Sequence, residues 1–128
     1  LKKVHGTKVL LVEDNLINQQ AFKVMLQKMG CKVDVLSNGK QAVDNFNKSE
    51  YDIVFMDIQM PEMGGIELTQ KIRSCEDVIR KSTPILGVTA NVMQEDRKKY
   101  LASGMDELVL KPFLEQELLE KIVKFIRK

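Results

Sequence analysis

The sequence has no tryptophan, and aromatic residues make up only 5% of its 128 residues. This scarcity argues against a platform of stacked aromatic side chains for single-stranded nucleic acid. The formal net charge is +2, which is too small to indicate attraction to nucleic acid or to an acidic membrane surface. No apolar run approaches membrane-spanning length, and no segment resembles a signal peptide. We therefore expect this domain to contact neither nucleic acid nor a membrane.

Cysteine is also scarce. Cys31 and Cys75 are the only two, and neither has a C-x-x-C partner or a nearby histidine. This usage is typical of reduced thiols, so we expect a cytoplasmic domain, whose parent chain could still be membrane-anchored. The chain begins with leucine, and we interpret it as a piece of a longer polypeptide. Residues 1–7 have no periodicity and are expected to be a leader or linker remnant, while residues 8–128 have the length of one domain.

Short apolar segments alternate with segments of helical periodicity along the whole chain. Apolar residues at helical spacing indicate a helix that Asn15 begins and Gly30 ends, with an inner face of Ala21, Phe22, Met25 and Met29. Strict alternation of strands and helices predicts an α/β fold with a parallel sheet covered on both faces. The predicted strands are Val9–Val12, Lys32–Leu36, Ile53–Asp57, Ile85–Val88 and Glu107–Leu110.

Polar side chains follow four of these strands. Glu13 and Asp14 end the first strand, Asp57 the third, Thr89 the fourth and Lys111 the fifth. Reactive groups in open parallel sheets gather at the carboxyl ends of the strands. We therefore expect three carboxylates, one hydroxyl and one ammonium group to converge there, although each alone is compatible with an ordinary structural role.

This set of side chains is suited to phosphoryl transfer. Three carboxylates in one pocket repel each other, and a divalent cation would remove the repulsion. Oxygen ligands without histidine or cysteine favour Mg²⁺ over zinc. Lys111 and Thr89 can hold an anion beside the metal, which leaves an Asp57 oxygen as the in-line nucleophile.

Four motifs in this order, "LLVEDN", "FMDIQMP", "GVTAN" and "LKPF", resemble those of the receiver domain of two-component response regulators. The resemblance extends from Lys8 to Lys128. It implies a flavodoxin-like (βα)5 three-layer sandwich with a five-stranded parallel sheet of order 2-1-3-4-5. The runs "EDNLINQQ" and "MDIQMPEMGG" are most similar to receivers of hybrid sensor histidine kinases, which suggests a histidine kinase parent chain.

The resemblance implies a phosphorelay role for this domain. Asp57 would take a phosphoryl group from a phosphohistidine of a histidine kinase or a histidine phosphotransfer protein. Thr89 and Lys111 would hold the phosphoryl oxygens. The domain would then switch conformation to act on an output domain, which could lie in the same parent chain. As an enzyme, it would at most phosphorylate itself and slowly dephosphorylate.

The same resemblance implies a metal site and a cis peptide bond. Asp14 and Asp57 would bind Mg²⁺ directly, the backbone carbonyl of Gln59 would be a third ligand, and Glu13 would act through a water molecule. The cis bond would precede Pro112, where an ordinary bond to proline is cis in about 5–6% of cases.

The sequence departs from the family pattern in two places. Leu108 stands three residues before Lys111, where many members carry the tyrosine or phenylalanine of a rotamer switch. Gly64 stands where aspartate is common, and we expect it to change only the flexibility of the turn.

Other functions are compatible with parts of the pattern. A degenerate receiver would only bind partner proteins, without metal or phosphate. An aspartate-nucleophile phosphohydrolase would carry a second aspartate two residues after the nucleophile, where this chain has Gln59. A flavin or nucleotide binder would need a glycine-containing loop after the first strand, whereas "EDNLIN" is acidic and would repel phosphate.

Overall fold

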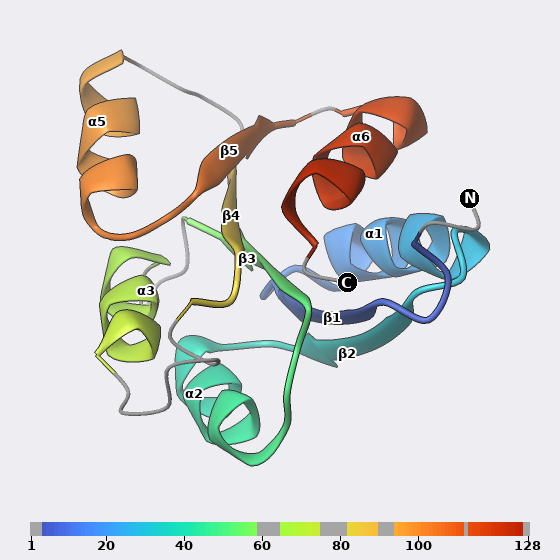
Figure 1. Cartoon of the computed structure of the whole chain (residues 1–128), viewed down its shortest axis with the longest axis horizontal. Coiled ribbons are helices and arrows are strands. Elements are labelled where there is room, and N and C mark those ends of the chain that lie inside the picture. The colour runs from blue at the N-terminus through green and yellow to red at the C-terminus, as the bar shows by residue number, and fades with distance from the viewer. Residues whose placement is uncertain (1–3, 59–64, 75–81, 90–93, 112, 127–128) are drawn as a thin grey trace.

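The computed structural model describes residues 4–58, 65–74, 82–89, 94–111 and 113–126. Within these residues, five strands alternate with five helices (Figure 1). In chain order they are β1 (Lys8–Val12), α1 (Leu16–Lys28), β2 (Lys32–Leu36), α2 (Gly39–Lys48), β3 (Ile53–Asp57), α3 (Gly65–Arg73), β4 (Ile85–Thr89), α5 (Gln94–Ala102), β5 (Glu107–Leu110) and α6 (Glu115–Phe125).

The strands form one parallel sheet of order β2-β1-β3-β4-β5, which confirms the predicted fold class and strand order. The strand bounds differ from the predicted ones by one residue at most, because β1 begins at Lys8 and β4 extends to Thr89. In the register of the sheet, Val12 lies opposite Met56, and Asp57 lies opposite Val88. The carboxyl ends of β1, β3 and β4 therefore lie at one edge of the sheet.

The helices cover both faces of the sheet. In Figure 1, α1 and α6 lie on one side of it, and α2 and α3 lie on the other. Side chains alternate between the two faces along each strand: Leu11 packs in the core under α1 and α6, and Leu10 packs under α2 and α3. Burial on both faces explains why the central strands are continuously apolar in sequence.

Helix α1 begins as predicted at an asparagine cap. The Asn15 side-chain oxygen accepts a hydrogen bond from the Asn18 backbone N–H at 3.0 Å. This bond satisfies one of the free amides of the first turn. The helix ends before Gly30, whose φ of 89° lies in the left-handed region that glycine adopts without strain.

The buried face of α1 differs in detail from the predicted one. Phe22, Leu26 and Met29 are buried, whereas Ala21 is exposed. The remaining inward position near the start of the helix holds a polar residue, Gln19, which is 7% exposed.

Part of the predicted leader packs against the domain. Val4 is fully buried in the core, and the Gly6 N–H donates to the Gly30 carbonyl at 2.8 Å. The Thr7 carbonyl accepts from the Lys32 N–H at 2.8 Å, and the Thr7 hydroxyl is buried without a hydrogen-bond partner among the described residues. The domain boundary at residue 8 stays a prediction, but residues 4–7 are structurally part of the described body.

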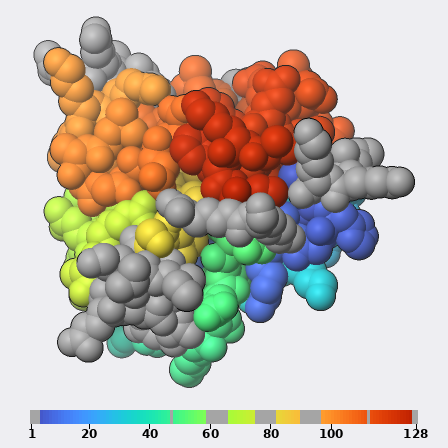
Figure 2. Space-filling model, in the orientation of Figure 1, coloured from blue at the N-terminus to red at the C-terminus, as the bar shows by residue number. Residues whose placement is uncertain are grey.

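A charge network links α5, β5 and α6, and Figure 2 shows the two helices on the same side of the molecule, in orange and red. Glu107 of β5 accepts from Arg97 of α5 at 3.0 Å and from Lys121 of α6 at 3.2 Å. Partial burial alone would raise the pKa of Glu107. The Leu108 N–H and the two cations outweigh that effect, so the pKa of Glu107 is lowered from its ordinary 4.5.

Candidate functional site

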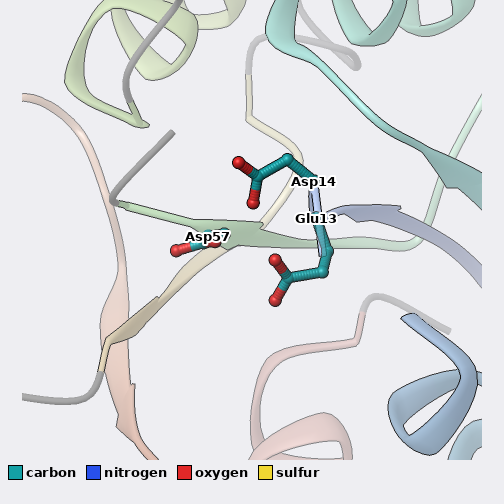
Figure 3. Close-up of side chains that lie close together, drawn as sticks. All are labelled: Glu13, Asp14 and Asp57. Carbon is teal, nitrogen blue, oxygen red and sulfur yellow. The ribbon is translucent and has the colours of Figure 1, made fainter. Parts of the chain in front are cut away.

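Three carboxyl groups meet at the carboxyl ends of β1 and β3. Figure 3 shows Glu13 and Asp14 leaving the end of β1 on opposite sides of the chain, with Asp57 at the end of β3 beside them. One oxygen from each residue lies within 4.8 Å of the other two. Glu13 and Asp57 are buried, at 2% and 9% exposed, whereas Asp14 is exposed. The cluster therefore opens to solvent on the Asp14 side.

The buried Glu13 carboxylate is bonded at both oxygens. Its Oε1 accepts from the Lys111 Nζ at 3.1 Å, and its Oε2 accepts from the Asn15 N–H at 3.2 Å. A buried carboxylate is tolerated only when it is paired and hydrogen-bonded, and these two contacts satisfy that condition. Lys111 lies 98 residues away in sequence, so this pair joins the two ends of the domain at the site.

Thr89 and Lys111 reach the same edge through the backbone. Thr89 is the last residue of β4 and is 2% exposed. Its carbonyl accepts from the Lys111 N–H at 2.8 Å, which fixes the residue after β5 next to the end of β4. All five side chains selected from the sequence thus lie at the carboxyl edge of the sheet.

Four other residues singled out in the sequence lie outside the described residues: Gln59, Gly64, Cys75 and Pro112. Leu108, at the position of the family's aromatic residue, is 5% exposed and lies in the core under α2 and α3. A Cβ placed on Gly87 would lie 2.9 Å from Leu108 Cδ2, so the end of this flexible side chain would have to shift to admit it.

A hollow of about 440 Å³ adjoins the acidic cluster. This hollow was not predicted from the sequence. Phe22 of α1 and Phe113 form its aromatic wall, with ring centroids 4.9 Å apart. Its lining comes from α1, the end of β1 and the segment after β5: Glu13, Asn18, Ala21, Phe22, Met25, Lys111 and Phe113. Two apolar residues at the start of α1, Leu16 and Ile17, are 70% and 79% exposed.

Gln19 was not predicted from the sequence, although its side chain contacts the Glu13 backbone beside the acidic cluster. Its amide Nε2 donates to the Glu13 backbone carbonyl and to the Ser37 Oγ. A signal was present, because Gln19 stands three residues before Phe22 and seven before Leu26, in the row that faces the core.

Comparison with known proteins identifies the family. The family model described as "Response regulator receiver domain" matches residues 9–123. This chain belongs to the response regulator receiver domain family. It is thus a receiver domain of two-component phosphorelay signalling, as the motifs predicted.

The similar full-length proteins are much longer than this receiver. It is 43% identical over 124 residues to "Hybrid signal transduction histidine kinase L" of Dictyostelium discoideum, covering 92% of this chain and 7% of that protein. It is 37% identical over 122 residues to "Transcription factor SKN7" of Saccharomyces cerevisiae, covering 95% of this chain and 19% of that protein. The chain therefore spans less than a fifth of the length of these relatives.

Two solved structures are close in fold to this receiver. The receiver domain of sensor histidine kinase PA1611 from Pseudomonas aeruginosa has a TM-score of 0.86 and 36% identity, covers 94% and 97% of the two chains, and holds a magnesium ion in its active-site cleft. The receiver domain of Ssk1 from Saccharomyces cerevisiae, solved with the histidine phosphotransfer protein Ypd1, has a TM-score of 0.86 and 31% identity over 94% and 89% of the chains.

Proposed function

We propose that this receiver takes a phosphoryl group onto Asp57 from a phosphohistidine of a histidine kinase or a histidine phosphotransfer protein. The observation that carries the proposal is the meeting of three carboxylates within 4.8 Å with Lys111 against one of them. Of the three acids, Asp57 lies at the end of β3, which is between β1 and β4 in the sheet.

The transfer exchanges one bond to phosphorus for another. An Asp57 oxygen attacks the phosphorus in line with the leaving nitrogen, so a P–O bond forms as the P–N bond breaks. The electron pair of the broken bond stays on the imidazole, which takes up a proton. The product is an acyl phosphate on Asp57, and no oxidant or further reactant is required.

The donor set fits Mg²⁺. The cluster offers carboxylate oxygens alone, which suit a hard divalent cation, and its Asp14 side is open to solvent, so metal-bound water can be accommodated. Asp14 and Asp57 would hold the ion directly. Glu13, whose two oxygens are engaged by Lys111 and Asn15, would act through water. Bound Mg²⁺ would neutralise charge on the phosphoryl oxygens; the Gln59 carbonyl stays a predicted further ligand.

Lys111 and Thr89 would receive the phosphoryl group. The Lys111 ammonium is 3.1 Å from Glu13 and its side chain is 24% exposed, so it lies at the rim of the cluster and can exchange one anion for another by side-chain rotation. The Thr89 hydroxyl would donate to a second oxygen. These new contacts exist only in the phosphorylated state, and their free energy is what would shift the domain between two conformations.

We further propose that residues 8–128 act as the receiver of a longer cytoplasmic or membrane-anchored histidine kinase, without contacts of their own to nucleic acid. The hybrid kinases among its relatives and the phosphotransfer complex of the related Ssk1 receiver support this assignment. No helix among the described residues is long and apolar enough to span a bilayer.

Incubation with phosphoramidate, which carries a P–N bond, tests the proposal. We expect the mass of the intact protein to increase by one phosphoryl group when Mg²⁺ is present and not when it is chelated. Asp57→Asn should stay unmodified, and Asp44→Asn, on the exposed side of α2, should react like wild type. Equal modification of Asp57→Asn would refute the site. A wild-type protein that does not react would indicate a degenerate receiver. Many rounds of phosphate release per protein molecule would indicate a phosphohydrolase.

A further inference from the structure

Gln19 places a primary amide where a core residue would be expected. It is 7% exposed and lies on the buried face of α1, in line with Phe22 and Leu26. Burying an amide costs free energy unless it is hydrogen-bonded, whereas burying an apolar side chain at this position would gain free energy. A polar residue here therefore needs a reason other than packing.

The contacts of Gln19 join three segments around the site. Its Nε2 donates to the backbone carbonyl of Glu13 at the end of β1, and to the Oγ of Ser37 after β2, at 3.3 Å. A backbone carbonyl can only accept, so the nitrogen end of the amide must face Glu13. The side chain thus extends from α1 to the peptide group that connects Glu13 to Asp14.

That peptide group sets the direction of the Asp14 side chain. A peptide unit is planar, so an amide that holds the Glu13 carbonyl also orients the bond from nitrogen to Cα of Asp14. The other end of Glu13 is fixed as well, because its N–H donates to the Leu36 carbonyl at 3.0 Å. The turn between β1 and α1 is therefore held from both sides at the residue before Asp14.

Asp14 depends on this backbone more than the other two acids do. The Glu13 carboxylate is held by Lys111 and Asn15, and Asp57 belongs to the fully buried strand β3. Within the described part of the chain, the exposed Asp14 carboxylate has no hydrogen bond or ion pair that holds it. Its position relative to the cluster follows from the course of the chain.

We propose that Gln19 is a positioning residue of the metal site, which fixes the Glu13–Asp14 peptide group so that the Asp14 carboxylate faces Asp57. The inference rests on the proposed function, because it assigns Asp14 to Mg²⁺. Gln19 itself touches neither the metal nor the phosphoryl group. Its hydrogen bond to the Glu13 carbonyl would orient a metal ligand without touching the metal, as hydrogen bonds to the ligands do in other metal sites.

The test compares Gln19→Met with Gln20→Met. Methionine keeps the length and flexibility of glutamine and removes the amide, while Gln20 is the exposed neighbour on the same helix. Mg²⁺ affinity is measured by calorimetry on folded protein, and amide hydrogen exchange of Asp14 and Asn15 is measured without metal. We expect Mg²⁺ to bind about tenfold more weakly to Gln19→Met, with faster exchange at both amides, and Gln20→Met to match wild type.

The outcomes separate this inference from the proposed function. A wild-type protein that does not bind Mg²⁺ would overturn the proposed function and the inference with it. Wild-type binding with unchanged affinity and exchange in Gln19→Met would overturn the inference alone, and lower stability without weaker binding would show a purely structural role. If Gln19→Met does not fold, Gln19→Asn, whose amide is one methylene too short to reach Glu13, is expected to show the same weaker binding.

Discussion

Removing the charge of Asp14 should stabilise the metal-free domain and abolish its stabilisation by Mg²⁺. Asp14→Asn keeps the shape of the side chain and removes one of three negative charges whose oxygens lie within 4.8 Å. Without a cation these charges repel each other in the folded state and much less in the unfolded chain. The substitution therefore raises the free energy of unfolding when metal is absent.

The size of the effect follows from the distances. Two unit charges 4.8 Å apart repel by about 0.9 kcal/mol in a water-like dielectric, which suits the exposed Asp14. Glu13 and Asp57 together give about 2 kcal/mol, part of which the Lys111 ion pair offsets. Asp14 also precedes the start of α1, where an acid contributes about 0.3–1 kcal/mol. The repulsion is larger, and we expect a net gain of about 1 kcal/mol.

Urea unfolding followed by circular dichroism measures this gain, since the chain has no tryptophan. In a chelator, the unfolding midpoint of Asp14→Asn should lie above that of wild type, and the exposed control Asp44→Asn should change little. At Mg²⁺ a hundredfold above its dissociation constant, wild type should gain about 2.7 kcal/mol, and Asp14→Asn should gain almost none.

Two results are incompatible with repulsion at a shared metal site. Asp14→Asn less stable than wild type in the chelator would show that the carboxylates do not repel in the folded state. Equal stabilisation of both proteins by Mg²⁺ would show that the metal binds elsewhere.

Three further predictions concern the rest of the fold. Thr7→Val, which removes a buried hydroxyl without a partner among the described residues, should raise the unfolding free energy by about 1 kcal/mol, and Thr7→Ser should lower it; urea titrations decide. Burial and the hydrogen bond to Asp34 raise the pKa of Tyr51 from its ordinary 10.0 to about 12. The stability advantage over Tyr51→Phe should therefore be complete below pH 10 and lost as pH rises towards 12; an advantage constant to pH 12 would contradict it. The pKa of Glu107 is lowered, so its contribution to the free energy of unfolding should be present above pH 4.5 and lost as pH falls through the folded-state pKa. Glu107→Gln should not show this loss of stability at low pH. In 1 M salt the difference in stability between the two proteins should become smaller.

The sheet was predictable because the apolar runs and their alternation with helices indicate the same fold. Apolar runs bounded by charges placed the strands within a residue, and alternation with helices fixed parallel pairing. The convergence of Glu13, Asp57, Thr89 and Lys111 followed from the same rule, since parallel strands end at one edge. The strand order itself came from the family resemblance.

The features that were missed depend on contacts between distant segments. The Lys111–Glu13 ion pair spans 98 residues, and no local pattern selects Glu13 over Asp57 as the partner. Val4 lies in a segment without periodicity, yet tertiary packing buries it. Gln19 could have been noticed as a polar residue in an apolar row, but its target, a backbone carbonyl, is visible only in the fold.

The most direct test of the phosphoacceptor assignment locates the phosphoryl group chemically. Borohydride reduces an aspartyl phosphate to homoserine, which peptide mass spectrometry can find in the phosphorylated protein. We expect homoserine at position 57 after treatment with phosphoramidate and Mg²⁺, and none when the metal is chelated. A reduced residue at Asp14 or Glu13 instead, with Asp57 intact, would contradict it.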